Sequence, residues 1–204
     1  MNSGAFRSPH TLLSRRAALR SALGAGALLA LPPAARSHTA AGAVRPPLAT
    51  PRLRVRTLEG RDADLATLLR DKVTAVQLMF TGCSATCPIQ GAVFAEIQRQ
   101  LQATAPEHLR LLSISIDALG DDAKALRTWL QRYRADLARW SAAAVAPESL
   151  DALFDFVRGR AAGADRHSAQ VYLFDRQARL VYRTLDMPPA DSVVSLMREV
   201  AKQA

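Results

Sequence analysis

The two cysteines of this chain are the residues best suited to chemistry. Cys83 and Cys87 lie four positions apart in the stretch TGCSATCP, residues 81–88, and the chain contains no other cysteine. Two thiols at this spacing can close a disulfide, exchange disulfides with a partner or hold a soft metal ion. A purely structural bridge across so short a loop would restrict the unfolded chain little. The spacing therefore favours redox chemistry or metal binding, and does not choose between them.

A metal site of two thiolates needs a further donor, and the folded region offers His108 and His167. A zinc site of four cysteines, or of three cysteines and one histidine, is excluded by the cysteine count, and the two histidines lack the close pairing of a zinc finger. His108 comes directly before an apolar run and is typical of a surface turn. His167 lies in the small, polar stretch GADRHS, residues 163–168, from which a loop can present an imidazole. Sulfur with imidazole favours Cu(I), whereas Cu(II) would add water or a carboxylate.

The elements that must position these residues alternate along the chain. Two apolar runs, residues 73–80 and 109–116, predict buried strands. Helical spacing of apolar residues predicts a helix between them, over residues 88–101, and three more helices over residues 121–137, 147–157 and 191–201. Residues 171–174 and 180–182 predict a hairpin. This order predicts an α/β, thioredoxin-like fold with a central mixed β-sheet flanked by helices.

Both cysteines fall on the predicted turn from the first strand to the following helix. Cys83 lies three residues beyond residue 80, and Cys87 directly precedes Pro88, a residue suited to an early helical position. The unpaired N–H groups and the positive dipole end of a helix N-terminus stabilise thiolate, which is both a better metal ligand and a better nucleophile than thiol. If the turn were helical, this spacing would point both sulfurs to one side.

The N-terminus predicts export from the cytosol. Arg15 and Arg16 precede an apolar run, residues 21–35, and no acidic residue occurs before Glu59. Residues 1–37 therefore read as a twin-arginine export signal, removed near His38 or, if it is retained, serving as a membrane anchor. Residues 38–51 are rich in Ala, Pro and Gly and predict a flexible linker. Residues 52–204 then form one domain, which we expect to be monomeric and either soluble in the periplasm or tethered to the cytoplasmic membrane.

Charge argues against a nucleic-acid partner. Five of the 27 basic residues lie in the first 37, so 22 basic residues face 18 acidic ones in the rest of the chain, and the net charge falls from +9 to about +4. The remaining Lys and Arg residues are scattered among acids and form no basic stripe with interleaved aromatic residues. A modestly basic surface of this kind suits an acidic partner or an anionic membrane better than nucleic acid.

Three segments together resemble the Sco/SenC family of exported, thioredoxin-fold copper chaperones. They are the residues 80–88 (FTGCSATCP), 113–117 (SISID) and 167–175 (HSAQVYLFD), and their order and spacing follow the family from about residue 52 to residue 200. The sequence differs from the common family pattern at Ser84 and Ala118, where proline is frequent, and at Arg166, where aspartate is frequent.

The resemblance implies a copper ion, Cu(I) or Cu(II), held by Cys83, Cys87 and His167. It also implies delivery of copper to the binuclear copper centre of cytochrome c oxidase, or preparation of that centre, so that the expected partner is the copper-bearing subunit of the oxidase or another copper or thiol partner. The alternative is a thiol-disulfide oxidoreductase of the thioredoxin type acting through Cys83 and Cys87. A peroxidase is less favoured, because no separate activating group accompanies a single cysteine.

Overall fold

A mixed sheet of eight strands forms the centre of the molecule, in the order β1-β8-β7-β4-β5-β6-β2-β3. The strands are β1 (Gly42–Ala49), β2 (Arg54–Thr57), β3 (Asp62–Asp64), β4 (Val73–Met79), β5 (Leu109–Ser115), β6 (Trp140–Val145), β7 (Val171–Phe174) and β8 (Arg179–Arg183). The neighbours β4, β5 and β6 run parallel, and the remaining pairs are antiparallel. β4 is buried along its whole length, which explains its largely apolar sequence.

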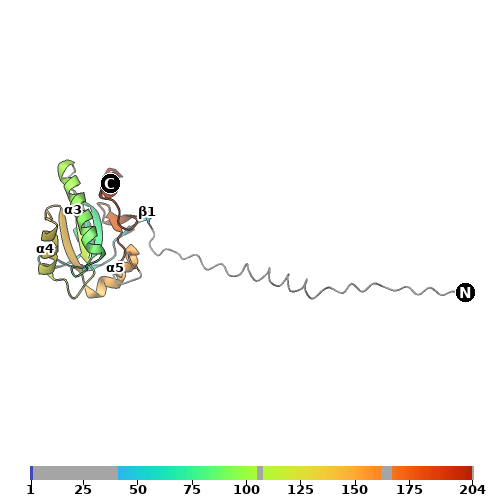
Figure 1. The fold of residues 1–204 in the computed structure, drawn as a ribbon, viewed down its shortest axis with the longest axis horizontal. Coiled ribbons are helices and arrows are strands. Elements are labelled where there is room, and N and C mark those ends of the chain that lie inside the picture. Colours follow the sequence, from blue (N-terminus) through green and yellow to red (C-terminus); the bar gives the residue numbers. More distant parts are fainter. Residues whose placement is uncertain (2–40, 105–107, 162–166, 204) are drawn as a thin grey trace. The chain divides into compact units, whose positions relative to one another are not determined.

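Helices cover both faces of this sheet (Figure 1). They are α2 (Leu65–Leu69), α3 (Thr86–Thr104), α4 (Ala123–Arg132), the short 3-10 helix η1 (Pro147–Ser149), α5 (Leu150–Val157) and α6 (Ala190–Gln203). One apolar core joins the sheet to α3, α4 and α6, and a second joins the opposite face to α2 and α5. Successive residues of β4 supply the two cores in turn, with Ala75 in the first and Val76 in the second. The architecture confirms the predicted thioredoxin-like α/β fold.

This computed structural model describes Met1 and residues 41–104, 108–161 and 167–203. The chain divides into two units, Met1–Ser37 and the body of the protein, His38–Ala204. The predicted export signal thus lies, apart from Met1, outside the described residues. Within the described ranges, no helix combines the length and the apolar character that crossing a membrane requires.

The structure corrects the predicted flexible linker over residues 38–51, because residues 42–49 form the edge strand β1. This strand pairs antiparallel with β8, from Gly42 opposite Arg183 to Ala49 opposite Arg179. The register shifts between Ala43 and Leu48, around the two prolines of the strand. Proline has no N–H to donate to a neighbouring strand, so it is tolerated at a sheet edge or where pairing is interrupted. The Ala, Pro and Gly content of this segment predicts a tether, but hydrogen bonding to β8 stabilises a strand instead.

Three further differences concern the end of one predicted helix, the elements that were not predicted and the division of another helix. α4 ends at Arg132 and not near residue 137, because Tyr133 caps it and Arg134 takes the left-handed conformation with φ 52°. The Ala-rich strand β6 was not predicted, and neither were the short elements β2, β3 and α2. The predicted helix over residues 147–157 is divided into η1 and α5.

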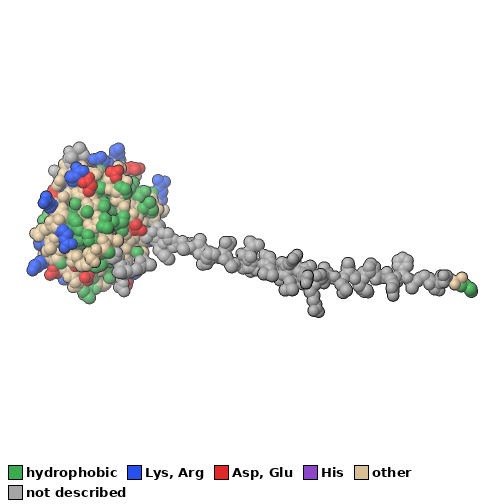
Figure 2. All heavy atoms as spheres, in the orientation of Figure 1, with side chains coloured by type: hydrophobic (Ala, Val, Ile, Leu, Met, Phe, Trp, Pro, Cys, Tyr) green, Lys and Arg blue, Asp and Glu red, His purple; other side chains and the backbone are tan. Residues whose placement is uncertain are grey.

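Charged side chains of both signs surround the hydrophobic area on the face drawn in Figure 2. Lys and Arg side chains lie beside Asp and Glu side chains around its rim. Mixed charge of this kind builds a weaker positive field than a uniform basic patch, and a uniform patch is what a phosphate backbone recognises.

Candidate metal centre

The candidate site lies at the edge of the sheet where β4 and β5 end. The two strands run parallel and in register to their last residues, Met79 and Ser115, so the loops that follow them emerge side by side. β7 is antiparallel to β4, with Val171 opposite Gln77, so the segment that precedes β7 reaches the same edge. The topology of the sheet therefore brings together the cysteine turn, residues 80–87, and the histidine segment, residues 167–170.

A buried carboxylate holds the start of the cysteine turn. Asp121 is 7% exposed, and its two carboxylate oxygens accept hydrogen bonds from the backbone N–H (2.8 Å) and the hydroxyl (2.5 Å) of Thr81. The hydroxyl of Ser115, at the end of β5, donates to the same carboxylate over 2.6 Å. Hydrogen bonds to a carboxylate are stronger than those between neutral groups. The loop after β5 thus fixes the turn that carries Cys83.

The two cysteines occupy different local structures. Cys83 precedes the helix and donates its backbone N–H to the carbonyl of Phe80 over 3.2 Å, whereas Cys87 lies in the first turn of α3 with Pro88 next to it. Both side chains are buried in the core beneath α3, and neither forms a disulfide. Because Cys83 lies outside the helix, the two cysteines are not related by helical spacing. The helix N-terminus acts directly on Cys87.

His167 meets Cys87 inside the protein. The Nε2 atom of His167 lies 3.8 Å from Sγ of Cys87, and the His167 side chain is buried. Its Nδ1 atom lies 3.0 Å from the carbonyl oxygen of Ser168. A carbonyl oxygen can only accept, so Nδ1 carries a proton, and when Nε2 carries none its lone pair is presented to the sulfur. The pair can share a thiol proton or hold a soft metal ion between sulfur and nitrogen.

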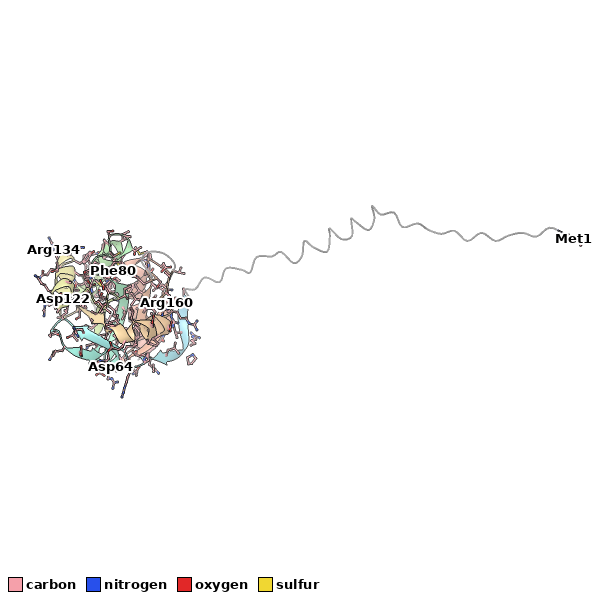
Figure 3. The ribbon with its side chains drawn as sticks, turned by 90° about the horizontal axis from the view of Figure 1, so that it is seen from below. Met1, Asp64, Phe80, Asp122, Arg134 and Arg160 are labelled. Carbon is pink, nitrogen blue, oxygen red and sulfur yellow. The ribbon has the colours of Figure 1, made fainter. Side chains whose placement is uncertain are left out.

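Phe80 and the segment after α5 frame the imidazole. The rings of Phe80 and His167 meet edge to face with centroids 6.3 Å apart, and the backbones of Arg160 and His167 form an isolated bridge. Figure 3 shows Phe80 between Asp122, at the start of α4, and Arg160. The Arg160 guanidinium pairs with Asp151 (2.7 Å) and Asp155 (3.3 Å) of α5. The charge of Arg160 is thus compensated by the two carboxylates of α5.

Tyr133 lies against the cysteine turn from the side of α4. Its hydroxyl donates to the carbonyl of Pro88 over 3.2 Å. Burial raises the pKa of Tyr133, negative charge on Cys87 and Cys83 raises it further, and Arg132 lowers it. The phenol therefore keeps its proton and remains a donor, and both sulfurs lie within electrostatic reach of it. A side chain at Gly91 could not coexist with this ring, because a Cβ there would lie 2.5 Å from Cζ of Tyr133.

The predicted site residues are only partly assembled. Cys87 and His167 are in contact, and Cys83 lies in the same turn, but no group of three or more His, Cys, Asp or Glu side chains in the described ranges is arranged to hold a metal ion. His108 lies at the opposite edge of the sheet, where its carbonyl accepts from Val73 at the start of β4. Arg166 lies outside the described residues.

Three residues that build this site were not predicted as part of it. Asp121, Gln90 and Tyr133 contact the cysteine turn, the histidine segment or the start of α3. Asp121 lies four residues after SISID, one of the three segments that carry the family resemblance, so an indirect signal for it stands nearby in the sequence. Gln90 and Tyr133 are ordinary helix and helix-cap residues, and their spacing carries no signal.

Sequence comparison gives one clear result. The sequence model of the SCO1/SenC family matches residues 59–202, which include the cysteine turn and His167. The chain matches no curated protein sequence.

Several solved structures share the fold. The crystal structure of yeast Sco1 with copper bound is 15% identical with a TM-score of 0.66, and the match covers 78% of this chain and 91% of that one. A SCO1/SenC family lipoprotein from Bacillus anthracis is 19% identical with a TM-score of 0.60, covering 78% and 99%. BsSco, a Sco family cytochrome c oxidase assembly protein in which a disulfide switch was identified, is 18% identical with a TM-score of 0.62, covering 78% and 96%. At these identities the likeness establishes the fold.

Proposed function

The chain belongs to the SCO1/SenC family, and we propose that it binds one copper ion through Cys83, Cys87 and His167 and acts in the assembly of cytochrome c oxidase. The observation that carries the proposal is the 3.8 Å contact between Sγ of Cys87 and Nε2 of His167. Nδ1 of the same ring donates a hydrogen bond to the carbonyl oxygen of Ser168. Copper-bound yeast Sco1 and the oxidase assembly protein BsSco have the same fold, which supports this choice of metal and of process.

The residues present suit copper. Cys87 and His167 supply a soft sulfur and a nitrogen with a free lone pair, the donors that Cu(I) favours. Cys83, buried in the same turn, supplies the second sulfur when the turn closes on the ion. The hydrogen bond from Nδ1 to Ser168 fixes the orientation of the imidazole, as an outer-shell partner does in established metal sites. The partner then takes the ion by exchanging its own ligands for these three.

A second function is favoured by the same contact. Nε2 of His167 can accept the proton of the Cys87 thiol, which would activate one cysteine for attack on a partner disulfide while the other resolves the mixed disulfide. Both cysteines lie within one turn and are buried beneath α3, which places a second sulfur close to the attacking one. This thiol-disulfide exchange would also prepare the cysteines of a copper centre.

We place the body outside the cytosol, exported by the leader of residues 1–37 and either free or tethered to the membrane. The Arg15-Arg16 leader and the fold shared with a family lipoprotein support this location.

Cells that lack the chain should distinguish the two functions. We expect them to contain little oxidase with a filled binuclear copper centre, and added copper salt should restore it, because a chaperone for copper becomes dispensable when its cargo is abundant. A thiol reductant added alone should have no effect. The copper content and activity of the oxidase measure the outcome, and restoration by the reductant alone would give first place to thiol-disulfide exchange.

A further inference from the structure

Gln90 connects the two segments that carry Cys87 and His167. It lies three residues after Cys87 on α3, so the two side chains leave the helix on one side. Both are buried, with 0% of Cys87 and 1% of Gln90 exposed. Nε2 of Gln90 donates to the carbonyl of Gln170 over 3.2 Å, and Gln170 lies three residues after His167. One turn of α3 therefore touches the histidine segment twice, through Cys87 and through Gln90.

The acceptor of this hydrogen bond is firmly held. The Gln170 side chain is fully buried, and its Nε2 donates to the carbonyl of Thr184 over 2.5 Å. The next residue, Val171, donates its N–H to the Thr184 hydroxyl over 2.8 Å and accepts from the Thr184 N–H over 3.0 Å. The bond from Gln90 therefore ends on a rigid part of the sheet, and it fixes the first turn of α3 against that part.

The other amide atom of Gln90 shows that packing alone does not explain this residue. Its Oε1 atom is buried and has no hydrogen-bond partner among the described residues. An unpaired buried oxygen lowers stability, whereas an apolar side chain of the same size would bring no such cost. The benefit of an amide here lies in the donor that reaches Gln170.

We propose that Gln90 is a positioning residue that sets the separation between Cys87 and His167. The hydrogen bond to Gln170 keeps the first turn of α3 at the distance where Sγ of Cys87 and Nε2 of His167 can act on one ion or one proton. The part of this inference that concerns copper binding rests on the proposed function. Without this hydrogen bond, the first turn of α3 and the histidine segment separate. Cys87 and His167 then have to come together again each time they bind an ion.

Gln98 provides a matched control on the same helix. It is also buried, with 6% of its surface exposed, and it also joins α3 to another segment. Its Nε2 donates to the carbonyl of Arg134 over 3.2 Å, and its Oε1 accepts from the N–H of Asp136 over 2.8 Å. These bonds reach the segment after α4 and not the histidine segment. Loss of Gln98 should lower stability without separating Cys87 from His167.

The test compares Gln90→Met with Gln98→Met in the full, reduced chain. Methionine keeps the length of glutamine and removes the amide, and Gln90→Leu gives a second apolar variant that cannot donate. In the metal-free protein, the nuclear Overhauser effect between the Cys87 β protons and the His167 ring should be detected in the wild type and in Gln98→Met. It should be lost or greatly weakened in both Gln90 variants. Their Cu(I) affinity should fall about 10-fold, and that of Gln98→Met should stay within about 3-fold of the wild type.

Each outcome decides the inference. An unchanged nuclear Overhauser effect in the Gln90 variants, or an equal loss in Gln98→Met, overturns the positioning role, because general destabilisation would then explain the data. If the wild type binds no Cu(I), the proposed function fails, and the metal-free measurement alone decides the role of Gln90. The effect reports only folded molecules, so a less stable variant still gives an answer.

Discussion

Serine in place of Cys87 should weaken Cu(I) binding at least about 100-fold. The ion loses one of two thiolates, and a hydroxyl, which neither ionises at neutral pH nor is soft, cannot replace it. Disturbing an outer-shell partner of a metal ligand already costs 10- to 100-fold in affinity, so loss of a ligand should cost at least the upper value. Competition with a Cu(I) chelator of known affinity under anaerobic conditions measures the change.

The neighbouring turn supplies the control for this experiment. Ser84 is exposed between the two cysteines, and Ser84→Ala should bind Cu(I) as the wild type does. Cys83→Ser should behave like Cys87→Ser, because the proposed site uses both sulfurs. If either cysteine variant kept Cu(I) affinity within about 3-fold of the wild type, the site would have to be placed elsewhere.

Alanine in place of His167 should bind Cu(II) at least about 10-fold more weakly than the wild type. Cu(II) prefers more nitrogen and oxygen donors than Cu(I), so it depends more on the imidazole, whereas Cu(I) can stay two-coordinate on sulfur and should lose less. The variant should still fold, although it loses the hydrogen bond to Ser168, worth about 1 kcal/mol, together with the contacts of the ring with Cys87 and Phe80. Titration of the reduced protein with each copper state, beside a thermal unfolding curve, measures both effects.

His108→Ala is the matched control, since it makes the same change at the far edge of the sheet. Nε2 of His108 is buried without a partner among the described residues, so its loss should leave copper binding unchanged. Equal affinity of His167→Ala and wild type for both copper states would remove His167 from the site. If Cys83→Ser still abolished oxidase assembly, the thiol-disulfide function would then take first place.

The central strands and the cysteine turn could be predicted because their signals are local. β4 and β5 are largely apolar runs of seven residues each, a length typical of strands, and the helix that begins beside Cys87 carries Pro88 and a regular apolar face. The two ends of α3 were placed within a few residues, at 88 and 101 against Thr86–Thr104.

Elements that depend on distant partners could not be predicted in this way. β6 reads WSAAAV, and its alanines favour a helix by intrinsic propensity, but the strand is buried between β5 and β2, whose ladders decide its structure. β1 contains two prolines and forms because β8 offers it an edge. In both cases tertiary pairing overrides the local preference.

The residues of the candidate site divide in the same way, into those with a local sequence signal and those that depend on distant partners. Cysteine and histidine can be recognised by type, because few side chains share their chemistry. Gln90 and Asp121 act through hydrogen bonds to segments 80 and 40 residues away, to Gln170 and Thr81, and nothing in their own neighbourhood indicates those partners. Residues that position a site are visible only once the fold has brought the segments together.

X-ray absorption at the copper edge of the reduced protein, loaded with Cu(I), tests the central claim most directly, because it identifies the donor atoms. One copper per chain with two sulfur neighbours and one imidazole nitrogen is expected, and the imidazole contribution should disappear in His167→Ala. The sulfurs can come only from Cys83 and Cys87 or from methionine, so Cys83→Ser identifies them. A copper shell of nitrogen and oxygen alone, or one that keeps both sulfurs in Cys83→Ser, would contradict the assignment of this site.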